Sequence, residues 1–215
     1  MTFSIVGLDK INSKLGVAVS TAMPNVGNTV PHVEPGLVAI ATQASSNRWY
    51  GPKGIKLLQL GLSPENALKT LLKEDDKKES RQIFYIDHKG RCAAHTGLLT
   101  KSWSGHIIGD DFVAGGNILT SSKVVEKMAD SFKSSDAPLE EKLMSSLEAG
   151  WREGGDSRGL RSSSLLVEFS EYDINGRPFM NLRVDDHDDP IGELKRLLSV
   201  NQKYRVLLDA AQGKK

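Results

Sequence analysis

Runs of residues that are apolar on both faces predict buried strands in the first part of the chain. Residues 3–6 are β-branched or aromatic at several positions, and the runs KLGVAVST and GLVAIATQA follow at residues 14–21 and 36–44. Residues 22–35, between the last two runs, hold three prolines and two asparagines. This composition predicts an irregular loop.

Later segments predict helices in pairs, with hairpins between the pairs. Apolar residues recur at helical spacing, and Ser63 and Asp189 are suitable N-caps in front of prolines. The expected helices cover residues 54–61, 64 to about 73, 121–132, 138–151 and 190 to about 210. The expected strands are two arms around a turn at 87–90, then 106–116, 163–170 and 179–186, the last two joined by a hairpin at Asn175-Gly176.

The order of these elements predicts the layers of the fold. It runs three strands, two helices, three strands, two helices, two strands and a helix, whereas a doubly wound parallel sheet requires strands and helices to alternate. Since several strands are apolar on both faces, we expect two antiparallel sheets packed together between helical layers. The predicted fold class is α+β, a four-layer αββα sandwich, in one domain over residues 1–215 that closes with the helix at about 190–210.

The composition argues against several classes of protein. Hydrophobic residues make up 39% and charged residues 26% of the 215 positions, as in an ordinary globular protein. The net charge of +1 gives no support to nucleic-acid or membrane binding, and no run is long enough to span a bilayer. A single cysteine, Cys92, allows no intramolecular disulfide and no cysteine-built zinc site. We therefore expect a cytoplasmic protein without a cofactor.

A hydroxyl at the start of the first strand suggests a specific chemistry. Thr2 directly follows Met1 and is small enough for ordinary aminopeptidase trimming to expose it. A threonine hydroxyl is a poor nucleophile without an adjacent base, and a free α-amine, with a pKa of about 8, is such a base on the same residue. In N-terminal nucleophile hydrolases, a first-strand Thr, Ser or Cys attacks an amide or ester carbonyl in this way. The alternative is that Thr2 merely begins the strand, because threonine has a high strand propensity.

Several short motifs together resemble one family. They are MTFSIV, LGVAVST, VAIATQA with Asn47, Tyr50 and Gly51 after it, AAHTG, Gly116-Asn117, GGDSRG and LRVDDHDDP. In this order and spacing, from residue 1 to about 198, they resemble the family called domain of unknown function 1028, which is regarded as N-terminal-nucleophile-like. The resemblance implies that fold and a hydrolase activity, and it names no substrate. The chain departs from the family at Thr21-Ala22-Met23, where Ser-Arg-Phe is common, and at Arg161, where glutamine is common, so we expect an altered substrate pocket.

Other polar residues stand where strands end. Thr42 and Gln43 close a buried strand, where a hydroxyl or an amide could contact a substrate. His95 in AAHTG is a further candidate for substrate binding, and Asn117, preceded by a glycine, could donate to an oxyanion. Each also has a structural alternative: a polar pair that satisfies the strand end, a hydrogen-bonded core histidine, or a glycine turn before a helix.

Two charged segments complete the set of candidates. In GGDSRG, Asp156 and Arg158 lie on a glycine-flanked loop, where an arginine could clamp a substrate carboxylate or could pair with the aspartate to stiffen the loop. The segment Asp185–Asp189 offers several carboxylates and His187 to a divalent metal. Because no second histidine stands at ligand spacing and Asp189 already serves as a helix cap, we expect no metal there.

The leading hypothesis is an amidohydrolase in which Thr2 attacks, its own amine is the base and Asn117 donates to the oxyanion. The substrate would be a small amide or peptide-like molecule, and a homo-oligomer is a further possibility. The alternative is a catalytically silent ligand-binding or structural protein with the same fold. A metal-dependent hydrolase built on Asp185–Asp189 comes third.

Overall fold

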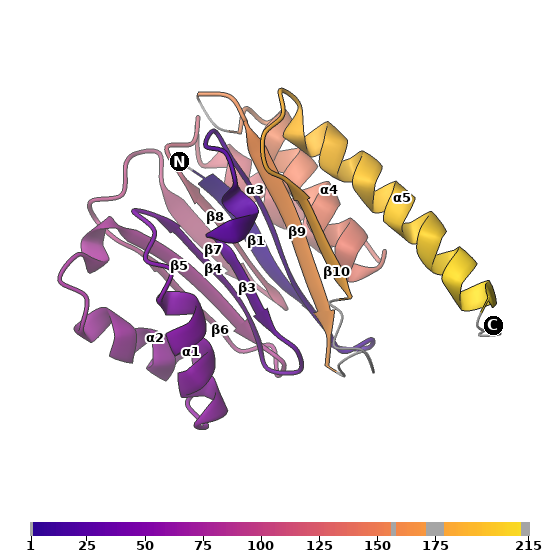
Figure 1. Ribbon diagram of the computed structural model, residues 1–215. Helices are drawn as coiled ribbons and strands as arrows, with labels where there is room; N and C mark the ends of the chain where they lie inside the picture. The colour runs from indigo at the N-terminus through magenta and orange to yellow at the C-terminus, as the bar shows by residue number, and fades with distance from the viewer. Residues whose placement is uncertain (1, 156–157, 171–178, 212–215) are drawn as a thin grey trace.

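Ten strands form two antiparallel sheets in the part of the chain that the computed structural model describes, residues 2–155, 158–170 and 179–211 (Figure 1). The larger sheet has the strand order β10-β9-β2-β1-β8-β7, and the smaller has the order β3-β4-β5-β6. The strands are β1 (Thr2–Asp9), β2 (Lys14–Thr21), β3 (Pro31–Glu34), β4 (Val38–Ala44), β5 (Arg81–Asp87), β6 (Cys92–Thr96), β7 (Gly105–Gly109), β8 (Phe112–Asn117), β9 (Ser162–Phe169) and β10 (Met180–Val184).

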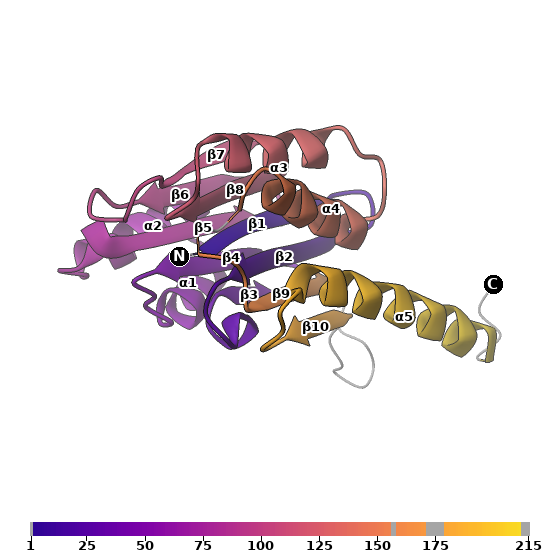
Figure 2. The same cartoon turned by 90° about the horizontal axis from the view of Figure 1, so that it is seen from above.

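Helices cover the outer faces of both sheets (Figure 2). In the described residues they are α1 (Tyr50–Gln59) and α2 (Pro64–Lys73) on the smaller sheet, and α3 (Lys123–Lys133), α4 (Leu139–Arg152) and α5 (Pro190–Ala211) on the larger. The predicted four-layer αββα sandwich is therefore confirmed. None of these described helices combines the length and the apolar composition that crossing a bilayer requires.

Between the two sheets and the two helical layers lie three layers of buried side chains, which side-chain alternation along the strands explains. In β1, Phe3 and Ile5 pack toward α3 and α4, while Val6 and Leu8 pack between the sheets. The third layer lies between the smaller sheet and α1 and α2, and Tyr85 belongs to it. Both faces of the central strands are buried, which is why their sequences are apolar throughout.

The structure corrects three predicted elements. The expected loop at 22–35 contains β3, an edge strand that begins at Pro31, and an edge position tolerates the missing N–H of proline. The single strand expected at 106–116 is a hairpin of β7 and β8, which turns at Asp111 with a left-handed φ of 65°. Helix α1 begins at Tyr50 and not at Gly54. The hairpin predicted at Asn175-Gly176 lies outside the described residues.

Both predicted N-caps are confirmed. The Ser63 hydroxyl accepts a hydrogen bond from the Asn66 N–H at 3.3 Å, and Pro64 occupies the first turn of α2. The carboxylate of Asp189 accepts one from the Gly192 N–H at 3.0 Å at the start of α5. Each cap satisfies a main-chain donor that the first helical turn leaves open.

Candidate functional site

The candidate site lies at the end of the two sheets where β1 begins (Figure 1). Thr2 pairs with Thr21, the last residue of β2, and with Asn117, the last residue of β8. In the smaller sheet, Gln43 near the end of β4 pairs with Gln82 near the start of β5. Antiparallel pairing thus brings residues that are far apart in the sequence to one end of the sandwich.

The side chains at this end face one another between the sheets. Val6 and Leu8 belong to the core between the sheets, and alternation along β1 puts Thr2 and Ser4 on the same face. The Ser4 hydroxyl donates to Oε1 of Gln43 across this layer at 2.7 Å. The layer between the sheets is therefore apolar in its middle and polar at the end where Thr2 lies.

Thr2 is nearly enclosed, with 7% of its surface exposed. Its hydroxyl donates to Oγ1 of Thr21 at 3.2 Å. Its carbonyl oxygen accepts long hydrogen bonds, 3.4 Å each, from Nδ2 of Asn117 and Nε2 of Gln43. The predicted nucleophile therefore lies beside a second threonine, and both sheets hold its main chain.

Asn117, the predicted oxyanion donor, lies next to Thr2 and is 2% exposed. Its second amide N–H donates to Oε1 of Gln82 at 3.1 Å. Both donors of the side chain are thus engaged within the protein. To stabilise an oxyanion, the amide must exchange one of these two bonds for the substrate.

Gln82 was not singled out from the sequence, although its side chain bonds to both Gln43 and Asn117, the two residues whose amides contact the Thr2 carbonyl. It is fully buried, and its Oε1 also accepts from Nε2 of Gln43 at 2.8 Å. The signal that could have revealed it is its place in β5, because Phe84 and Ile86 on the same face are apolar members of the core between the sheets. A polar residue in that series indicates a partner inside the protein.

His106 on β7 ends the network and was likewise not selected from the sequence. Nε2 of Gln82 lies 3.0 Å from the Thr96 hydroxyl, one of three acceptors around its two hydrogens, and that hydroxyl lies 2.8 Å from Nδ1 of His106. Burial, and to a lesser extent nearby His95, lowers the pKa of His106, which favours the neutral imidazole. The direction of the hydrogen bond between Thr96 and Nδ1 follows from which nitrogen of that imidazole carries the proton.

Two predicted substrate-binding residues lie away from Thr2. The Thr42 side chain is fully buried on the face of β4 opposite to Gln43, and its hydroxyl donates to the Asn47 carbonyl at 3.2 Å. His95 lies on the outer face of β6, where its Nε2 is 2.9 Å from the carbonyl oxygen of Lys78. Of these candidates, the structure brings Gln43 and Asn117 to Thr2.

The described residues on either side of 156–157 lie at the end of the sandwich where Thr2 lies. On one side, the Thr120 N–H donates to the Gly155 carbonyl at 3.4 Å, and on the other, the Arg161 N–H donates to the Thr21 carbonyl at 2.8 Å. The Arg158 side chain is exposed, whereas Asp156 lies outside the residues that the structure describes. Arg158, predicted to bind a substrate carboxylate, therefore lies in the sequence between two residues that are hydrogen-bonded at the same end of the fold as Thr2.

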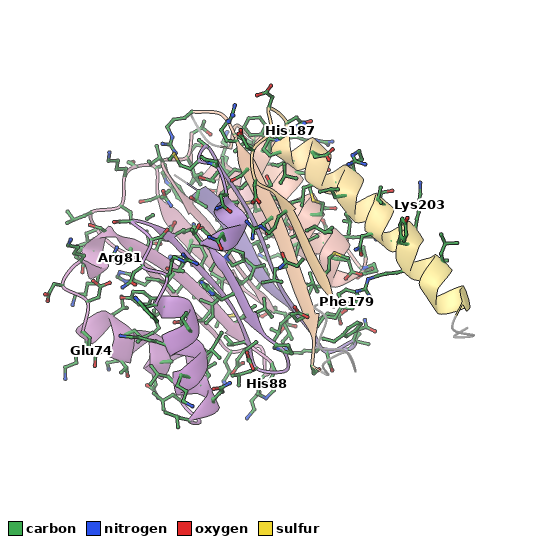
Figure 3. All side chains as sticks on the ribbon, viewed as in Figure 1. Glu74, Arg81, His88, Phe179, His187 and Lys203 are labelled. Carbon is green, nitrogen blue, oxygen red and sulfur yellow. The ribbon has the colours of Figure 1, made fainter. Side chains whose placement is uncertain are left out.

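The acidic segment before α5 contains His187, labelled in Figure 3, and is paired with arginines. Arg161 binds Asp186 at 2.5 Å and Asp188 at 3.3 Å, and Arg183 binds Asp185 at 2.9 Å. Among the described residues, no group of three histidine, cysteine, aspartate or glutamate side chains is arranged to hold a metal ion. Arg161 thus anchors this segment beside the candidate site.

A buried ion pair supports the turn after Gln43. Nε of Arg81 binds the Asp75 carboxylate at 2.9 Å, and the same guanidinium donates to the Ser45 carbonyl. The Tyr50 hydroxyl also donates to Asp75, at 3.1 Å. Burial alone raises the pKa of Asp75, but these hydrogen bonds, with Arg81 first among them, outweigh it and lower the pKa to about 2.

Comparison with known proteins points to one family. The profile described as "Family of unknown function (DUF1028)" matches residues 2–194. The chain is also similar to protein SPO2555 from Silicibacter pomeroyi, a DUF1028 protein of known crystal structure, with a TM-score of 0.83 and 30% identity over 92% of this chain and 88% of that chain. No protein with a curated description matches the chain.

Two other solved structures overlap only weakly. One is Anbu (ancestral beta-subunit) from Yersinia bercovieri, with a TM-score of 0.42 and 14% identity over 100% of this chain and 98% of that chain. The other is Thiobacillus denitrificans BPH, with a TM-score of 0.42 and 16% identity over 80% of this chain and 100% of that chain. Overlaps at this level carry no argument. The profile match over nearly the whole length and the likeness to SPO2555 are decisive: the chain belongs to the DUF1028 family.

Proposed function

We propose that this protein is an amidohydrolase whose nucleophile is the Thr2 hydroxyl, activated when the Met1–Thr2 peptide bond is cleaved. The observation that carries the proposal is the position of Thr2, at the polar end of the layer between the sheets, with its carbonyl held by amides from both sheets. A strand-initial hydroxyl that is fixed in this way has the rigidity that a positioned nucleophile requires.

The chemistry follows from the amine that cleavage would release. The free α-amine takes the hydroxyl proton while Oγ1 attacks the substrate's carbonyl carbon, and the resulting ammonium gives that proton to the departing amine. A water molecule then hydrolyses the ester on Thr2 by the same route. Asn117 supports the oxyanion if its amide turns one N–H from the Thr2 carbonyl to the substrate.

The substrate we propose is a small amide or peptide-like molecule that carries a carboxylate. Arg158 is exposed and lies in the sequence between Gly155 and Arg161, which are both tied to this end of the fold. An arginine fork binds carboxylates with two parallel hydrogen bonds. Gln43 and Asn117 supply the neighbouring polar groups. Thr42 and His95 belong to the opposite face of the smaller sheet and have no part in this arrangement.

A catalytically silent binding protein is the competing function, and two observations favour it. Thr2 is 7% exposed, and both amide hydrogens of Asn117 are engaged within the protein. Such a protein would keep the fold and the network without cleaving the Met1–Thr2 bond.

The two functions are separated by the N-terminal peptide of protein from its native host, together with hydrolysis of an amide library. The hydrolase requires a peptide that begins at Thr2 and an activity that Thr2→Ala abolishes. Thr42→Val, which removes a buried threonine hydroxyl on the opposite face of β4, is the matched control and should retain activity. A uniformly intact Met1–Thr2 bond, or hydrolysis unaffected by Thr2→Ala, would overturn the proposal.

A further inference from the structure

The amide of Gln82 can point in only one direction. Its Nε2 faces the main-chain carbonyls of Gly116 at 2.8 Å and Gly105 at 3.1 Å. A main-chain carbonyl only accepts hydrogen bonds, so the nitrogen end of the amide must face these two groups and the oxygen end must face the opposite side. Two fixed backbone atoms therefore determine how this buried side chain is oriented.

That orientation passes to the two neighbouring amides. Oε1 of Gln82 is an acceptor, so Gln43 and Asn117 must turn their nitrogen ends toward it, at 2.8 and 3.1 Å. In both residues the same nitrogen also faces the Thr2 carbonyl at 3.4 Å. The other end of the Gln43 amide, Oε1, then accepts a hydrogen bond from the Ser4 hydroxyl at 2.7 Å.

The backbone next to both amides is strained. Ala44, directly after Gln43, has φ of 70°, and Ile118, directly after Asn117, has φ of 56°. Left-handed backbone is unfavourable for alanine and more so for a β-branched residue. Strain of this kind persists where the surrounding structure imposes it, and it concentrates at functional sites.

We propose that Gln82 is a positioning residue that orients Gln43 and Asn117 on the carbonyl of Thr2 and thereby fixes the nucleophile at the start of β1. This inference rests on the proposed function in that it takes Thr2 as the nucleophile. Phe84 and Ile86 show that the same face of β5 accepts apolar side chains, so a well-packed core does not itself require an amide at this position.

The first test is made on the wild-type protein by following side-chain amide hydrogen exchange with NMR. We expect the amides of Gln43, Gln82 and Asn117 to exchange at least about a hundredfold more slowly than that of exposed Gln59. Exchange of the three buried amides as fast as that of Gln59 would overturn the proposal, and no variant needs to fold for this result.

The second test compares three variants under conditions where all are folded. Gln82→Met should accelerate the side-chain exchange of Gln43 and Asn117 by about tenfold or more, because it removes their common acceptor. Thr96→Val removes one acceptor of Gln82 but leaves the two main-chain carbonyls, so it should leave that exchange unchanged. Tyr85→Phe removes a buried hydrogen bond from the opposite face of β5 and controls for lost stability. Unchanged exchange in Gln82→Met refutes the orienting role.

The third test measures the reactivity of Thr2 after a methionine aminopeptidase has exposed its amine. The probe is a β-lactone, whose carbonyl the threonine hydroxyl attacks; the ring C–O bond breaks, the ring oxygen takes the proton, and the whole lactone adds to the protein. We expect Gln82→Met to slow this acylation by about ten- to a hundredfold relative to Tyr85→Phe. Equal rates in the two variants would overturn the positioning role and leave the nucleophile intact.

A failure of the proposed function would look different. If the wild-type protein with a free Thr2 amine is not acylated, Thr2 is not the nucleophile. The exchange measurements on Gln43 and Asn117 still decide, in that case, whether Gln82 orients the two amides.

Discussion

The ion pair between Lys14 and Glu140 allows a worked prediction about how the larger sheet is joined to its helices. Lys14 Nζ lies 3.0 and 3.2 Å from the two carboxylate oxygens of Glu140, in the first turn of α4, and only 10% and 9% of the two side chains are exposed. The ammonium also lies over the rings of Phe179, at 4.6 Å, and Phe169, at 5.1 Å. Phe179 directly precedes β10, at the end of that strand remote from His187 (Figure 3).

Glu140→Gln should lower the free energy of unfolding by about 3 kcal/mol. Breaking a buried pair by removing one charge costs about 3–5 kcal/mol, because the other charge is left in a poorly solvated site. The substituted amide still offers an acceptor, and the two aromatic faces still attract the ammonium by about 0.5–2 kcal/mol each, so the cost falls at the lower end. For a protein of this size, this loss corresponds to a fall in Tm of about 6–12 °C.

The assay is urea unfolding of a double-mutant cycle. The cycle uses Lys14→Met and Glu140→Leu as single variants, each of which should cost at least about as much as Glu140→Gln. The two substitutions combined remove both charges and should cost about 1 kcal/mol or less. Matching transition slopes would show that only stability has changed. A cost below about 1 kcal/mol for Glu140→Gln, or a double variant no milder than the two single losses together, would refute the reasoning.

Three further outcomes follow from single contacts. Gly16→Ala should cost about 1–3 kcal/mol in urea unfolding, because the added Cβ would lie 2.7 Å from Leu143 Cδ1; unchanged stability would show that α4 can move away. Ala44→Gly should raise stability by about 0.5–1 kcal/mol, since relief of the left-handed φ outweighs the entropy of glycine, and a loss would contradict this. Asp75 has a folded-state pKa of about 2, below its ordinary 3.8, because burial, which raises the pKa, is outweighed by hydrogen bonds, first among them the one from Arg81. The ionised carboxylate therefore stabilises the fold fully above about pH 4, and this contribution is lost as the pH falls toward 2. Over that window the wild type should lose about 2 kcal/mol that Asp75→Asn does not lose, and parallel acid profiles would exclude this role.

The layers of the fold could be predicted because burial on both faces leaves a plain record in a strand's sequence. The apolar residues of β2 and β4 are examples, since each strand lies between a sheet and a helical layer. The sequence of β3 predicts a strand less clearly, because β3 is short, starts at Pro31 and lies at an edge of its sheet. Its pairing with β4 depends on register, which the local sequence does not determine.

The candidate site could be predicted only in part, because it is built from contacts between the sheets. Thr42 and Gln43 are adjacent and must face opposite sides of β4, but which of them faces Thr2 depends on the sheet that packs against that strand. Gln82 gains its role only when Gln43 and Asn117 arrive from other strands. Buried amides of this kind are recognised by their partners and not by their neighbours in sequence.

The central claim, that the hydroxyl of Thr2 is a nucleophile, is tested most directly by the mass of the N-terminal peptide after β-lactone treatment of protein with a free Thr2 amine. The account predicts the addition of one lactone, located on Thr2 and absent in Thr2→Ala, while Thr42→Val is still labelled. An unlabelled N-terminal peptide, or a lactone on Thr21 in place of its hydrogen-bonded neighbour, would contradict the account.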